Sequence, residues 1–84
     1  MAKAPPRALQ DAYEAVFTAL AHPARRLILM TLNFEGGEMN AGAIAALFRH
    51  AWPTTTRHLQ VLEDAGLITH ERQGREQQRM AARS

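Results

Sequence analysis

A change of pattern at Gly66 constrains the fold of this chain more than any other feature of its sequence. Residues 52–65 follow the apolar spacing of a helix, and glycine is the residue type that most often ends a helix in the left-handed conformation. Residues 67–69 then have strand character, and Gln73-Gly74 can turn a hairpin that returns from Arg75 to about Arg79. The inner face of the helix is predicted to contain Thr55, Leu59 and Leu62.

Three more helices are predicted before residue 52. The first spans about 7–21, and its apolar residues share one helical face. A second spans about 23–33, because Pro23 suits the first turn of a helix, where its missing N–H is not needed. This helix is apolar nearly all round (Leu27, Ile28, Leu29, Met30 and Leu32), which is typical of a central helix. A loop at 35–38 follows, and Asn40 is a suitable N-cap for a third, short helix.

The order of these elements predicts a winged helix-turn-helix: a mainly α fold in which four helices are followed by a two-stranded wing. Residues 1–6, which include two prolines, are expected to be a disordered lead-in, and residues 7–84 to form one domain. The recognition helix would span about 52–65 and the wing about 67–80. A chain of 84 residues can bury only one small core, which excludes a two-domain enzyme with a cleft between its lobes.

Composition narrows the function classes. The chain has no cysteine, which excludes disulfides, thiolate metal sites and a cysteine nucleophile. It shows no signal peptide and no apolar run near the ~18–20 residues of a membrane span, so we expect a cytoplasmic protein without a membrane partner. The formal net charge of +2 agrees only weakly with nucleic-acid binding, but the segment from Arg72 to Ser84 holds four arginines and one glutamate.

The residues of the fourth helix that point away from its inner face are of types that bind DNA. They are Thr54, Thr56, Arg57 and Gln60. Arginine can bind guanine and glutamine can bind adenine through two hydrogen bonds, and a threonine hydroxyl can bind a phosphate or a base edge. A solvated polar face is the alternative explanation. The position of this face, after a short connection between helices and before a hairpin, favours DNA contact.

Much of the chain, from residue 17 to 76, resembles the arsenic-repressor (ArsR/SmtB) family of bacterial winged-helix regulators. The similar stretches are residues 19–29 (ALAHPARRLIL), 54–68 (TTTRHLQVLEDAGLI) and 72–75 (RQGR). The resemblance implies a homodimeric DNA-binding transcriptional repressor that reads an inverted-repeat operator. The operator sequence, the regulated genes and the inducing signal cannot be taken from one sequence.

The resemblance also implies which residues bind DNA. The threonines and Arg57 would read the major groove, and Arg75 would reach the minor groove or the backbone. The full expected set is Thr54, Thr55, Thr56, Arg57, Gln60, Arg72 and Arg75. The chain departs from the family at Arg49, His50 and Ala51, where members usually have glycine, an aliphatic residue and serine. These departures leave open whether Trp52 contacts DNA or packs in the turn.

The apolar face of the first helix is the expected dimer interface. It consists of Leu9, Tyr13, Val16, Phe17 and Leu20, some of which must also close the core of the monomer. In the family this helix packs against its two-fold mate, together with a helix after the wing. Here the chain stops soon after the wing. Either it is truncated, or the first helix carries a weaker dimer alone.

No catalytic residue, metal site or cofactor is predicted. The four histidines are His22, His50, His58 and His70, and none has another His, Asp or Glu three or four residues along the same helix. The sequence has no glycine-rich phosphate loop and no nucleophile motif, so an enzyme is not expected. The alternative function is a winged-helix protein–protein interaction module without sequence-specific DNA binding, which the aromatic Trp52 keeps open.

Overall fold

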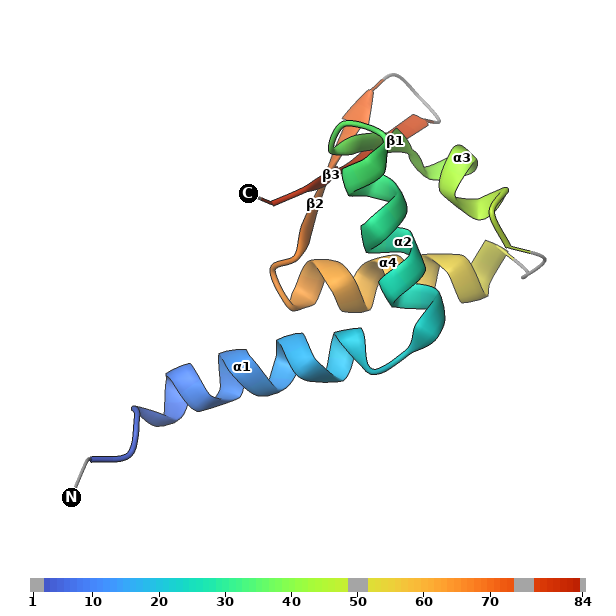
Figure 1. The fold of residues 1–84 in the computed structure, drawn as a ribbon. Helices are drawn as coiled ribbons and strands as arrows, with labels where there is room; N and C mark the ends of the chain where they lie inside the picture. Colours follow the sequence, from blue (N-terminus) through green and yellow to red (C-terminus); the bar gives the residue numbers. More distant parts are fainter. Residues whose placement is uncertain (1–2, 49–51, 74–76, 84) are drawn as a thin grey trace.

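The helices and short strands of this chain surround one core, and the first helix extends away from it (Figure 1). A computed structural model describes residues 3–48, 52–73 and 77–83. Its elements, in chain order, are α1 (Arg7–Leu20), α2 (Pro23–Phe34), β1 (Glu38–Asn40), α3 (Ala41–Ala45), α4 (Trp52–Asp64), β2 (Ile68–Gln73) and β3 (Gln77–Ala82). The predicted fold class, a winged helix-turn-helix with a mainly α body, is confirmed.

The α1–α2 junction forms at His22-Pro23, as the sequence predicts. The His22 side chain caps α2 by accepting a hydrogen bond from the backbone N–H of Ala24 (3.2 Å), and Pro23 is the first helical residue. Arg26 donates from Nη1 to the backbone oxygen of Leu20 (2.7 Å), which ties the first turn of α2 to the last turn of α1. Figure 1 shows that the rest of α1 then extends away from the other helices.

The ends of the helices follow the capping rules. Asn40 accepts a hydrogen bond from the backbone N–H of Gly42 (2.7 Å) and begins α3. Gly66 has a φ of 78° after the last turn of α4, and the N–H of Leu67 donates to the backbone oxygen of Leu62 (3.0 Å). This Schellman closure turns the chain from α4 directly into β2. The departures at 49–51 lie outside the described residues.

The sheet has a strand that the sequence did not predict. Its order is β1–β3–β2 with antiparallel neighbours, so β1 extends the expected two-stranded wing to three strands. Glu38, the first residue of β1, was expected to lie in the loop at 35–38, and a strand of three residues is too short to show an alternating pattern in the sequence. Its partner is far away in sequence: Glu38 pairs with Ala81, and Met39 with Met80. The tip of the β2–β3 hairpin, at 74–76, lies outside the described residues.

The core lies where α2, α3, α4 and the sheet meet. The largest fully buried apolar side chains come from all four: Ile28, Leu32, Ile44, Leu62 and Ile68. The first helix contributes only Ala19 to the set of buried residues. The core therefore fixes α4 and the wing relative to each other and leaves most of α1 outside it.

Candidate nucleic-acid interface

The inner face of α4 holds the helix against the core. Thr55, His58, Leu59 and Leu62 are buried, which confirms the predicted inner positions of Thr55, Leu59 and Leu62. The prediction that Thr55 also contacts DNA is wrong, because its side chain is 0% exposed. Its Oγ1 atom has no hydrogen-bond partner among the described residues. Of the three consecutive threonines, Thr54 and Thr56 therefore reach the surface and Thr55 does not.

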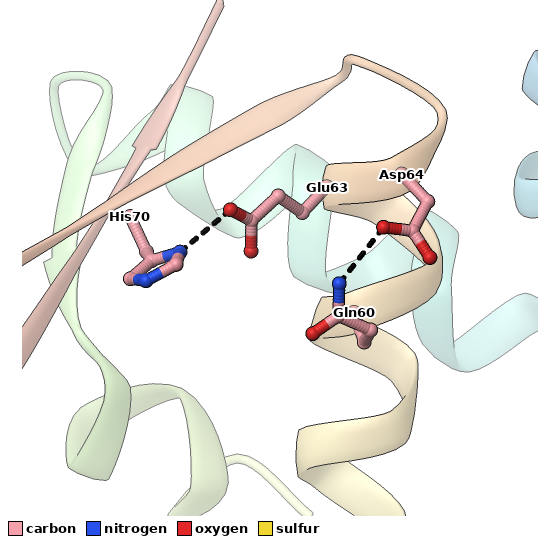
Figure 2. Close-up of polar contacts among 4 residues, drawn as sticks. All are labelled: Gln60, Glu63, Asp64 and His70. Atoms are coloured by element: carbon pink, nitrogen blue, oxygen red, sulfur yellow. Dashed lines mark hydrogen bonds and ion pairs between the residues drawn. The ribbon is translucent and has the colours of Figure 1, made fainter.

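The outer face of α4 forms an exposed polar ridge, which we define as Thr54, Thr56, Arg57 and Gln60. Arg57 makes no ion pair with any described carboxylate. Gln60 is less free, since its Nε2 atom donates to Oδ1 of Asp64 one turn later (2.8 Å; Figure 2). The Gln60 amide still has its oxygen and a second N–H for a further partner.

Two grooves flank this polar ridge. The α2–α4 groove, about 380 Å³ in volume, is lined by His22, Arg25, Thr54, Arg57, His58 and Val61. The α4–wing groove, about 220 Å³, is lined by Trp52, Thr56, Leu59, Gln60, Glu63, His70 and Met80. They differ in charge: the first has two arginines and no carboxylate among its lining residues, whereas the second contains Glu63. The positive charge next to the ridge thus lies on its α2 side.

The wing is held to α4 by a contact that the sequence analysis missed. Nδ1 of His70 in β2 lies 2.6 Å from Oε1 of Glu63 in α4, as Figure 2 shows. The period of two along β2 could have indicated it, because His70 follows the buried Ile68 by two residues and so shares its face.

The arginines of the wing are only partly described. The backbone of Arg72 lies in β2, while Arg75 lies outside the described residues. The DNA-binding roles of both therefore stay predictions. Arg79 in β3 is engaged within the sheet, since its Nη1 atom lies 3.0 Å from Oε2 of Glu38 in β1.

The predicted dimer face on α1 is largely exposed. Leu9, Tyr13 and Phe17 are 46%, 59% and 66% exposed, and the rings of Tyr13 and Phe17 stack with their centroids 6.4 Å apart. Val16 and Leu20 are half-buried, so they are the members of this face that pack toward the rest of the monomer. Leu9, Tyr13 and Phe17 are therefore available to contact another surface.

The second helix is less central than its composition indicates. Ile28 and Leu32 are fully buried, but three other apolar side chains of α2 are exposed: Leu27, Met30 and Phe34. The expectation of a central helix therefore holds for one side of α2, which supplies Ile28 and Leu32 to the core, and not for the whole of its apolar surface. One side of α2 packs on the core, and the other adds apolar surface to the molecule.

Within residues 3–48, 52–73 and 77–83, no cluster of three or more His, Asp or Glu side chains is placed to bind a metal ion. Across those same residues, no helix is long and apolar enough to cross a bilayer. The absence of a cofactor and the cytoplasmic location stay predictions.

The short helix α3, the helix α4 with its polar ridge, and the hairpin behind it define a winged helix-turn-helix protein. A family model described as "Helix-turn-helix domain" matches residues 20–71. The transcriptional repressor SdpR of Bacillus subtilis is 42% identical over 59 residues, which make up 70% of this chain and 63% of SdpR.

Solved structures agree with this class. A crystal structure of an ArsR family transcriptional regulator matches with a TM-score of 0.79 and 32% identity, over 99% of this chain and 77% of the other. The homodimeric winged helix-turn-helix DNA-binding domain Mb0332 of Mycobacterium bovis matches with a TM-score of 0.78 and 33% identity, over 98% and 75% of the two chains. This chain belongs to the ArsR/SmtB family of transcriptional regulators, as its motifs indicated. It spans 52–63% of the length of the curated repressors that it matches.

Proposed function

We propose that this chain is the DNA-binding unit of a transcriptional repressor that binds an inverted-repeat operator as a homodimer. The observation that carries the proposal is the exposed ridge of Thr54, Thr56, Arg57 and Gln60, which the buried face of the same helix holds outward. A helix presented in this way can enter a major groove and bring its N-terminal residues to the base edges. The names of the matching repressors support the same role.

Dimerisation follows from the operator. Two recognition helices must lie about 34–36 Å apart to read both halves of a palindrome, and a two-fold dimer provides that spacing. We propose that the exposed face of Leu9, Tyr13 and Phe17 supplies the contact, since an isologous interface lets one apolar stripe meet its own copy. The homodimeric state of the Mb0332 domain supports this arrangement.

The test is an anisotropy titration of the protein against DNA from upstream of its own coding sequence. Arg57→Ala should weaken binding by about 1–3 kcal/mol if Arg57 makes a bidentate base contact, and should relax specificity at one base pair in each half-site. Arg7→Ala is the matched control, because Arg7 is an exposed arginine on another element, α1, and among the described residues its ion-pair partner is Asp11. If Arg57→Ala bound operator and random DNA as tightly as the parent, α4 would not be the recognition helix.

A protein–protein interaction module is the second candidate, and one observation favours it. Trp52 is 52% exposed and lines the α4–wing groove, so an aromatic side chain is available at the start of α4. A module of this kind would bind neither upstream nor random DNA at low salt. In both candidates the chain is a binding protein and not an enzyme.

A further inference from the structure

The α2–α4 groove brings four hydrogen-bond donors together next to the polar ridge. Arg25 and Arg57 supply guanidinium groups, Thr54 supplies a hydroxyl, and His22 supplies an imidazole. Thr54 and Arg57 also belong to the ridge, whereas His22 and Arg25 come from the start of α2 and lie outside the predicted DNA-binding set; for Arg25 the sequence left a structural and a phosphate-facing role open. None of the six lining residues is acidic.

Arg25 and its neighbour Arg26 make different contacts, and this difference could not be predicted from the sequence. Arg26 is used within the fold, because its Nη1 atom donates to the backbone oxygen of Leu20 (2.7 Å). Arg25 is half-buried, and its Nε atom is buried without a hydrogen-bond acceptor among the described residues. A buried donor without an acceptor costs free energy, and it shows that the described residues do not hold the Arg25 guanidinium through Nε in the way that Leu20 holds Arg26.

His22 fixes one side of the groove. Its Nδ1 atom accepts the N–H of Ala24, so the ring proton is on Nε2, which remains a donor. Its ring packs on that of His58 with centroids 4.5 Å apart and a 53° angle between the planes. Because His58 is buried in α4, this contact links the first turn of α2 to the recognition helix.

These donors fit an anion with several acceptor oxygens. Guanidinium groups bind phosphate through two parallel N–H···O bonds, and no carboxylate in the groove lining competes for them. A duplex that lies on the ridge brings its backbone phosphates to the flanks of the recognition helix. We propose that the α2–α4 groove binds a DNA backbone phosphate, with Arg25 as its principal ligand and His22 as a second donor. This inference rests on the proposed function.

Because a phosphate contact carries no sequence information, a random-sequence DNA duplex is a sufficient probe. Anisotropy titrations from about 50 to 200 mM salt would compare the parent with Arg25→Gln, Arg25→Lys and Arg7→Gln. Arg25→Gln should weaken binding about tenfold at the lowest salt and reduce the slope of log K against log salt by about 1. Arg25→Lys should keep the slope, since it keeps the charge. Arg7→Gln removes an equal charge outside the groove and should leave both quantities near those of the parent.

The outcomes separate this inference from the proposed function. If the parent binds no duplex at low salt, the proposed function fails and the inference fails with it. If the parent binds and Arg25→Gln has the same affinity and slope, only the phosphate site is overturned. A loss on upstream DNA but not on random DNA would make Arg25 a base-reading residue instead. Free phosphate is the other possible source of this ligand, and titration with inorganic phosphate tests it. If Arg25→Gln abolished phosphate binding but left the salt slope of DNA binding unchanged, the groove would bind a free anion and not the DNA backbone.

Discussion

The Nδ1 atom of His70 lies 2.6 Å from the Oε1 atom of Glu63, and this contact joins strand β2 to helix α4 (Figure 2). A carboxylate only accepts hydrogen bonds, so His70 is the donor. The two elements are already connected through Gly66, and the contact adds a second link farther along β2. It therefore ties the wing to α4 at a second point.

The energy of this link is expected to be small. The two side chains are 44% and 30% exposed, and exposed ion pairs contribute about 0.2–1 kcal/mol. A double-mutant cycle with His70→Ala and Glu63→Ala, read by urea unfolding, should give a coupling energy in that range. A coupling near zero would mean that the main-chain connection at Gly66 alone positions the wing.

Thr55→Val should stabilise the protein without changing its binding of DNA. The Thr55 side chain is fully buried and its hydroxyl has no partner among the described residues, so a methyl group in its place removes a desolvation cost. We expect the free energy of unfolding to rise by about 1 kcal/mol. DNA affinity should stay within about twofold of the parent value, because Thr55 does not reach the surface. A large loss of affinity in a folded Thr55→Val protein would return this residue to the DNA-binding set.

The wing is expected to act on the DNA backbone or the narrow minor groove. Arg75→Ala should therefore weaken binding to many sequences about equally, and should reduce the salt slope by about 1. The measurement is a set of titrations on upstream and random duplexes at several salt concentrations. A changed base preference in the major groove would show that the wing, and not α4, reads sequence.

The parts of this fold that local chemistry determines could be predicted from the sequence. Pro23 begins α2, Asn40 caps α3 and Gly66 ends α4, because each residue satisfies or closes the backbone at its own position. Strand β1 could not be predicted, since its strand character comes from pairing Glu38 with Ala81. Because the partner strand is far away in the sequence, the three residues of β1 carry no local pattern that predicts the pairing.

For the candidate site, too, some features could be predicted from the sequence and others could not. Helical periodicity placed Thr55 inside, and the family resemblance, which treats the threonines together, wrongly added it to the DNA-binding set. Arg25 and Arg26 are adjacent and chemically identical, so sequence could not separate them. Their roles differ because the end of α1 lies within reach of Arg26, whereas Arg25 lines a groove against α4.

Divalent metals are not expected to control DNA binding. The chain has no cysteine, and among the described residues no group of three or more His, Asp or Glu side chains is placed to hold a metal ion. Titration with zinc, nickel or cobalt should leave DNA affinity within about threefold of its metal-free value. A tight stoichiometric site that releases DNA would require ligands from two protomers.

The exposed face of α1 should determine assembly. The exposed fractions of Tyr13, Phe17 and Leu9 indicate an apolar stripe, and pairing with its copy would remove this surface from water. Tyr13→Glu places a charge in the centre of that stripe, so it should raise the dissociation constant of the dimer by at least about tenfold. Sedimentation velocity of the parent and the variant at micromolar concentrations is the measurement, and the dimer should be sensitive to dilution.

Phe34→Glu is the matched control for this prediction. Phe34 is an aromatic residue that is 88% exposed on α2, so the same charge is added to an apolar surface outside α1. If α1 carries the contact, Phe34→Glu remains a dimer where Tyr13→Glu dissociates. The reverse result would place the interface on the exposed side of α2. A parent protein that is monomeric at every concentration would contradict dimerisation of this chain altogether, and operator binding would then have to begin with two monomers meeting on DNA.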